Sequence, residues 1–155
     1  MTIFNDLATS IIASVLMSGT PLESSLEDLT CMTEAIYHEA RGEDLYGQMK
    51  VANVIMNRAE IAYRGRTSVC DVVVDPYQFS YRNGRRSVPV KPQSHESDNF
   101  KQIVALAKLA VDGGLPDYTN GALHYYAQDV VYPKWSDEAS FVMVYGGHTF
   151  LSGVR

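Results

Sequence analysis

The segment from about Gly47 to Tyr63 constrains the fold of this chain more than any other part of the sequence. At about 100° per residue, its apolar side chains cover a broad arc of a helix and leave only a narrow polar stripe. That stripe consists of Lys50, Asn53 and Asn57. A helix that is apolar over so much of its circumference lies at the centre of a domain. Because buried amides must be hydrogen-bonded, we expect Asn53 and Asn57 to anchor loops or to line a cleft, and we favour loop anchoring.

A second helix is predicted over about residues 25–41, and Gly42 ends it. Its apolar face carries a carboxylate, Glu39, which lies among Leu29, Met32, Ala35 and Ile36. Burying an unpaired carboxylate costs several kcal/mol or raises its pKa. Glu39 is therefore either a general acid where the helix meets a cleft, or the partner of Arg41, Arg58 or another base in a structural ion pair. The helix alone does not decide between these interpretations.

The rest of the pattern predicts an α+β fold that is mainly helical with a small C-terminal β-hairpin. The elements in chain order are a short helix or strand over 68–74, a long irregular region over 75–99, a helix over 98–112, and extended segments over 122–126, 141–145 and 148–151. A length of 155 residues suits one domain. We assign residues 25–155 to that domain and residues 1–24 to an N-terminal helix packed on it.

The N-terminal segment contains an apolar run at residues 11–17 that no Lys or Arg precedes. The run is shorter than the about 20 residues of a membrane span, and a secretory signal requires a basic flank. We therefore expect no stable membrane insertion and no clear signal peptide, with a weak export or membrane-release signal as the alternative. The net charge of −5 argues against nucleic acid as a partner.

Cysteine and histidine residues give little indication of metal or thiol chemistry. Cys31 lies inside an apolar helical pattern, so we expect Cys31 and Cys70 to be buried thiols, with a disulfide as the alternative. His38 and Glu39 begin a zinc-peptidase motif, but Gly42 occupies the position of its second histidine. A zinc site formed by His124, His148 and Asp129 is a minor alternative. We expect no metal and no cofactor.

The irregular region contains aromatic residues interleaved with amides and arginines, which is typical of a surface for sugar rings and acidic groups. These residues include Tyr77, Gln78, Phe79, Ser80, Tyr81 and Arg82. A basic, solvated loop is the alternative. Glycoside cleavage usually takes two carboxylates, and neither Glu43 nor Asp75 has a setting comparable to that of Glu39. One glutamate suffices when the substrate supplies the nucleophile.

Two adjacent segments, Tyr37–Glu43 and Gly47–Arg58, resemble the SleB-type cell wall hydrolases, the spore-cortex-lytic enzyme family. Lys50 replaces the small residue that is usual at its position. Looser similarity to the family continues in Cys70–Val73, Gln78–Ser80, Thr119–Tyr126, Trp135 and Gly147–Phe150. The resemblance extends from about Leu29 to the end of the chain.

This resemblance implies a lysozyme-like fold related to lytic transglycosylases, with Glu39 as the catalytic general acid. It implies cleavage of peptidoglycan between N-acetylmuramic acid and N-acetylglucosamine, giving 1,6-anhydro products. Glu43 and Arg58 are expected to support Glu39. The expected substrate contacts are Gln48, Asn53, Gln78, Phe79, Ser80, Tyr125 and Tyr126.

Several alternatives stay open at this point: a hydrolytic muramidase, a metal-dependent wall amidase or peptidase, a non-enzymatic wall-binding module, and a structural virion component. We expect a monomer that is made in the bacterial cytoplasm and acts on the cell wall or in the periplasm. A phage endolysin used for cell lysis fits these expectations best.

Overall fold

The computed structural model describes residues 26–75, 79, 90–127 and 140–152. The N-terminal helix predicted within residues 1–24 lies outside the described residues. So do Gln78, Ser80 and Asp129.

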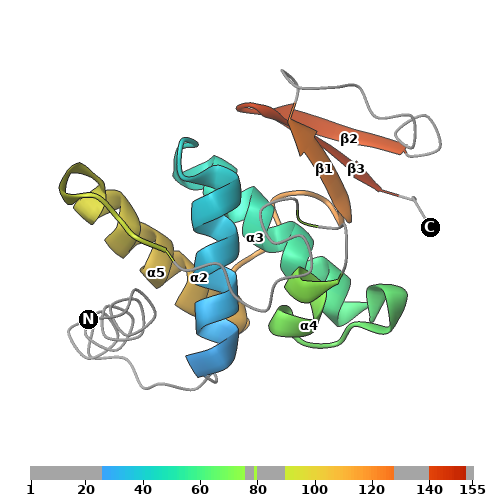
Figure 1. Ribbon diagram of the computed structural model, residues 1–155. Helices are drawn as coiled ribbons and strands as arrows, with labels where there is room; N and C mark the ends of the chain where they lie inside the picture. Colours follow the sequence, from blue (N-terminus) through green and yellow to red (C-terminus); the bar gives the residue numbers. More distant parts are fainter. Residues whose placement is uncertain (1–25, 76–78, 80–89, 128–139, 153–155) are drawn as a thin grey trace.

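Four α-helices form the larger part of the described residues, and Figure 1 shows α2 crossing in front of α3 and α5, with α4 below. The helices are α2 (Leu26–Ala40), α3 (Leu45–Glu60), α4 (Val69–Val74) and α5 (Ser97–Val111), and two short 3₁₀ helices are η1 (Tyr63–Gly65) and η2 (Ser94–Glu96). The predicted helices over 25–41, 47–63 and 98–112 are confirmed within a few residues at their ends. None of the helices in these described ranges is both long and apolar enough to cross a membrane.

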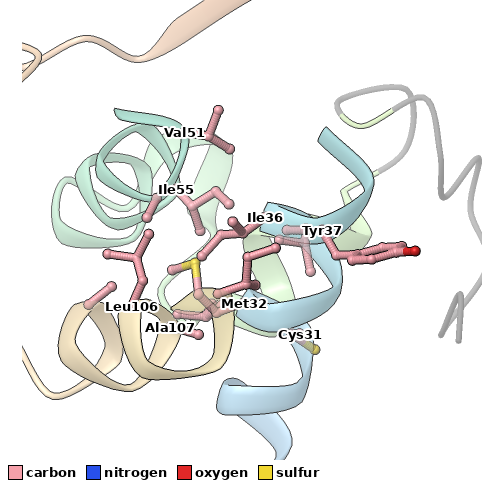
Figure 2. Packing of buried hydrophobic residues seen from close by; sticks show 14 of the residues in the cluster. Cys31, Met32, Ile36, Tyr37, Val51, Ile55, Leu106 and Ala107 are labelled. Atoms are coloured by element: carbon pink, nitrogen blue, oxygen red, sulfur yellow. The ribbon is translucent and has the colours of Figure 1, made fainter. Parts of the chain in front are cut away.

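The main core lies where α2, α3 and α5 meet. Figure 2 shows the side chains that fill it: Met32 and Ile36 of α2, Val51 and Ile55 of α3, and Leu106 and Ala107 of α5. The central position predicted for α3 is confirmed, because its residues also enter a second, smaller core beneath the sheet, formed by Val54, Ala122 and Phe150.

Both ends of α3 differ from the predicted ends. Asp44 caps the helix by accepting a hydrogen bond from the Gly47 N–H at 2.8 Å, so the helix begins at Leu45 rather than at Gly47. The helix stops at Glu60 because Ala62 and Arg64 adopt left-handed backbone angles, each with φ of 53°. A left-handed residue cannot continue a right-handed helix.

Within the part of the chain that the structure describes, the sheet has three antiparallel strands, β1 (His124–Ala127), β2 (Ser140–Tyr145) and β3 (His148–Ser152), in the order β1-β3-β2. The predicted hairpin is confirmed as β2 and β3, and β1 adds a third strand along β3. A bulge between Phe141 and Met143 interrupts the register of β2 with β3. The predicted extended segment near residue 124 is therefore part of the same sheet, because one edge of β3 provides backbone hydrogen-bond partners for it.

Cys31 and Cys70 form a disulfide bond, so the expectation of two buried thiols was wrong. The bond joins α2 to α4, with the two Cα atoms 5.3 Å apart, a normal separation for a disulfide. The two cysteines are 39 residues apart in the chain. Their proximity results from the packing of α4 against α2, and no local sequence pattern encodes that packing.

Candidate active site

Glu39 lies in the last turn of α2, where this helix approaches β1, and its side chain is partly exposed. The Tyr125 hydroxyl donates a hydrogen bond to Glu39 Oε2 at 2.8 Å. Burial raises the pKa of the Glu39 carboxyl above its ordinary value, and the Tyr125 hydrogen bond and the charge of Arg58 partly offset this effect. A carboxyl group in this setting keeps its proton to a higher pH than an exposed one, as a general acid requires.

The structural ion pair that was the alternative for Glu39 is not formed within the described part of the chain. Arg41 instead places its guanidinium over the Tyr37 ring, 4.9 Å from the ring centroid, and lies 4.0 Å from Glu96. Arg58 acts on Glu39 through its charge. The geometry therefore favours the general acid over the ion-paired carboxylate.

Tyr125 is held in place by two aromatic neighbours from β3. The His148 ring packs edge-on against it at a centroid distance of 5.1 Å, and the Phe150 ring lies at 5.8 Å. His148 Nδ1 lies 3.5 Å from Glu43 Oε1, and burial lowers the pKa of the imidazole while Glu43 raises it. Sequence reasoning gave His148 a possible role only as a zinc ligand, as a minor alternative, although it follows the Gly146–Gly147 turn within a family-like segment.

Glu43 connects the turn after α2 to the β2–β3 turn. Its Oε1 accepts a hydrogen bond from the Gly147 N–H at 3.1 Å. A Cβ atom on Gly146 would overlap Glu43 Oε2, and Gly146 has a φ of 54°. Both the limited space and the left-handed backbone therefore favour glycine at this position. Glu43 is therefore placed to support the site through the sheet.

Arg58 is buried and its guanidinium contacts both backbone and rings. Its Nε donates to the Leu123 carbonyl at 2.6 Å, and its Nη2 lies 3.3 Å from His124 Nδ1. The Tyr63 and Phe79 rings each lie 5.4 Å from its Cζ. Phe79 is itself buried in the main core. In this structure Phe79 supports Arg58, and its position does not favour direct contact with a substrate.

Gln48 is fully buried and holds the turn that follows Glu39. Its Nε2 donates to the Ala40 and Glu43 carbonyls, each at 3.3 Å, and to Asn99 Oδ1 at 2.9 Å. Asn99 in turn donates to the Arg41 carbonyl at 2.9 Å. These bonds tie the 40–43 turn to α3 and α5, so the predicted substrate contact at Gln48 is not supported. Sequence reasoning missed Asn99, which lies in no recognisable motif.

Asn53 and Asn57 anchor the loop that leads into β1, as we had favoured. Asn53 donates to the Pro116 carbonyl and accepts from the Tyr118 N–H, both at 3.0 Å. Asn57 donates to the Ala122 carbonyl at 3.0 Å. These hydrogen bonds occupy the two amide side chains in the polar stripe of α3, and the substrate contact at Asn53 stays a prediction.

Tyr126 and Asp75 are the two further residues that sequence reasoning had considered for the site. Tyr126 is partly exposed and follows Tyr125 along β1, so its side chain points to the other face of the sheet. Asp75, one of the two acids weighed as a partner for Glu39, lies 2.7 Å from Arg64 and 3.3 Å from Arg66. Among the described residues, no group of three or more His, Cys, Asp or Glu side chains could hold a metal ion.

Comparison with known proteins gives a consistent result. The family model described as Cell Wall Hydrolase matches residues 42–151, well over half of the chain, beginning three residues after Glu39. The spore cortex-lytic enzyme of Bacillus cereus is 30% identical over 133 residues, which cover 86% of this chain and 47% of that protein. The corresponding enzyme of Oceanobacillus iheyensis is 30% identical over 131 residues, 84% of this chain and 43% of that protein. The chain thus spans less than half the length of these relatives.

Two solved structures share the fold. The catalytic domain of the germination-specific lytic transglycosylase SleB from Bacillus anthracis has a TM-score of 0.65 and 29% identity, covering 86% of this chain and all of that one. The catalytic domain of Bacillus cereus SleB has a TM-score of 0.63 and 29% identity, covering 85% of this chain and 94% of that one. The predicted lysozyme-like, mainly helical fold is confirmed. This chain belongs to the cell wall hydrolase family.

Proposed function

We propose that this domain cleaves the glycan strand of peptidoglycan between N-acetylmuramic acid and N-acetylglucosamine, with Glu39 as general acid and base. The observation that carries the proposal is the partly buried carboxyl of Glu39, which has no ion pair among the described residues and accepts a hydrogen bond from Tyr125. The similarity to SleB, which is named a lytic transglycosylase, supports the same chemistry.

The proposed reaction begins when protonated Glu39 gives its proton to the glycosidic oxygen, and the bond from that oxygen to C1 of the muramic acid breaks. The C6 hydroxyl of the same sugar attacks C1, and its proton passes to the Glu39 carboxylate. The product carries a 1,6-anhydro ring, no water is consumed, and Glu39 returns to its starting state. Each step uses one carboxyl group, first as acid and then as base.

The setting of the other nearby acids supports a mechanism with one carboxylate. Two-carboxylate hydrolases need a second acid that acts as nucleophile or activates a water. Asp75 is paired with Arg64 and Arg66, and Glu43 accepts the Gly147 N–H. Neither carboxylate is poised for a second role, so an attacking hydroxyl from the substrate fits the site better than an activated water.

The test is digestion of purified sacculi, followed by mass spectrometry of the soluble fragments. We expect anhydro-muropeptides from the wild type and none from Glu39→Gln, whereas Glu60→Gln, the same change at an exposed position of α3, should retain activity. Fragments that have gained a water would show that the enzyme is a hydrolytic muramidase and not a transglycosylase. An absence of soluble fragments would refute both, and loss of activity on exhaustive chelation would favour the metal-dependent amidase or peptidase.

We also propose that the domain works as a monomer outside the cytoplasm and serves cell lysis in the manner of a phage endolysin. The Cys31–Cys70 disulfide supports an oxidising compartment, because such bonds are rare in the reducing cytoplasm. Lysis of cells that express the protein, measured with and without a membrane-permeabilising agent, tests whether it must first leave the cytoplasm.

A further inference from the structure

A cluster of three tyrosine rings surrounds one lysine between α3 and β2. We call this cluster the tyrosine platform: Tyr46 and Lys50 of α3, Tyr118 of the following loop, and Tyr145 of β2. The Lys50 Nζ lies 4.2 Å from the Tyr145 ring centroid and 5.9 Å from those of Tyr46 and Tyr118. We propose that the tyrosine platform is a second binding surface for peptidoglycan strands, an inference that rests on the proposed function.

The tyrosine platform presents aromatic surface to solvent. Tyr46 is 53% exposed and Tyr118 is 40% exposed, while the Lys50 beneath them is only 8% exposed. Exposed apolar surface gathered in one place marks interaction sites more often than apolar residues scattered singly. Tyrosine is well suited to such a surface because its ring is rigid and its hydroxyl stays in contact with water.

Several contacts fix the rings in place before any ligand arrives. Asn53 accepts the Tyr118 N–H at 3.0 Å and so ties the loop to α3. The Tyr145 hydroxyl donates to Asp44 Oδ2 at 2.8 Å. The Tyr46 and Tyr118 rings meet edge to face at a centroid distance of 6.3 Å, with Lys50 as a shared cation for all three rings. A surface ordered in this way loses little conformational freedom on binding.

The chemistry of the platform matches a saccharide better than a lipid or an apolar protein surface. Pyranose rings present C–H faces that stack on aromatic rings, together with hydroxyl groups that need acceptors. Asp44 is exposed beside the rings, and a carboxylate has lone pairs beyond those used by the Gly47 N–H and Tyr145. Asp117, also exposed, lies on the same loop as Tyr118. Two exposed carboxylates make the surroundings of the rings unfavourable for membrane or apolar contacts.

The platform is separate from the candidate active site yet connected to it. In the strand order β1-β3-β2, Tyr125 lies on β1 and Tyr145 lies on β2, with β3 between them. Tyr125 is the residue that contacts Glu39. Glu43 and Asp44 are adjacent in the chain, and they contact the β2–β3 turn and Tyr145, respectively. In this proposal, a glycan strand bound at the platform is held at a point other than the bond that is cleaved at Glu39. Its binding keeps the enzyme at the insoluble polymer and raises the local substrate concentration.

The experiment separates binding from cleavage. Sedimentation of protein with purified sacculi is measured for Glu39→Gln alone and combined with Tyr46→Ala and Tyr118→Ala, both at exposed positions. Glu39→Gln with Ile61→Ala, an exposed apolar residue just after α3, is the matched control. We expect affinity for sacculi to fall about tenfold in the tyrosine variant and to stay constant in the control. In the background with Glu39 intact, we expect the ratio of activity on sacculi to activity on a soluble tetrasaccharide fragment to fall to a similar degree.

Equal affinity of the tyrosine variant and the control for sacculi would overturn the proposal. So would a wild type that sediments as a dimer and becomes a monomer in the tyrosine variant, since the platform would then bind a second copy of the chain. Lys50→Met, which keeps the apolar stem and removes the charge, should weaken binding less than loss of the rings. If the wild type releases no soluble fragments, the proposed function fails. The sedimentation measurement still tests the platform in that case, because binding to sacculi requires no cleavage.

Discussion

Replacing Tyr125 with phenylalanine removes one hydroxyl from the candidate active site and retains the ring. The lost hydroxyl donates to Glu39 Oε2 at 2.8 Å, and the retained ring still packs on His148 and Phe150. This hydrogen bond favours the ionised carboxylate and so lowers the pKa of Glu39, against the larger effect of burial, which raises it. The substitution therefore raises the pKa of Glu39 further.

The size of the change follows from the kind of bond that is lost. A hydrogen bond to a charged group contributes about 1.5–3 kcal/mol, and one pKa unit corresponds to about 1.4 kcal/mol. Glu39 is partly exposed, so water replaces part of the lost interaction. We expect a rise of about 1 pKa unit, from the lower end of that range.

The assay is the pH dependence of kcat/KM on soluble glycan strands. Because Glu39 must be protonated to act as the acid, activity falls as pH rises through its pKa, and this alkaline limb should move up by about 1 pH unit in Tyr125→Phe. Tyr126→Phe removes the same hydroxyl one residue further along β1 and should leave the limb in place. A limb that stays where it is in Tyr125→Phe, or that moves to lower pH, would refute the assignment of Glu39 as the acid poised by Tyr125.

Two further predictions concern stability. Replacing Cys31 and Cys70 with serine opens a loop of 39 residues, and on the chain-entropy model this lowers the unfolding free energy by up to about 4 kcal/mol. Urea denaturation would measure this loss. A loss below about 1 kcal/mol would mean that α4 packs on α2 without the disulfide. Glu39→Gln should stabilise the fold at neutral pH by about 1 kcal/mol. Because the pKa of Glu39 is raised in the folded state, its contribution to stability is present below the unfolded pKa and is lost as pH rises through the folded pKa. The stability advantage of Glu39→Gln should therefore vanish near pH 4. An equal gain in unfolding free energy at neutral pH and near pH 4 would contradict the explanation by a buried charge.

The sequence by itself determined the helices and the position of Glu39 on one of them. Periodic apolar residues specified α2, α3 and α5, because helical periodicity is a local property of consecutive residues. The same periodicity placed Glu39 on an apolar face. It also indicated that Asn53 and Asn57 required partners, because a buried amide cannot stay unpaired.

The tertiary structure alone decided which distant residues meet. The Tyr125 hydroxyl reaches Glu39 across 86 residues of chain, Gly147 meets Glu43 across 104, and Cys31 meets Cys70 across 39. None of these contacts has a local pattern, because each depends on the path that the chain takes between helices and strands. Gln48 shows the same limit: its family-like position suggested a substrate contact, whereas packing buries it under the turn that follows Glu39. The sequence could thus place Glu39 on an apolar face, and only the packed structure shows which groups raise and lower the pKa of its carboxyl.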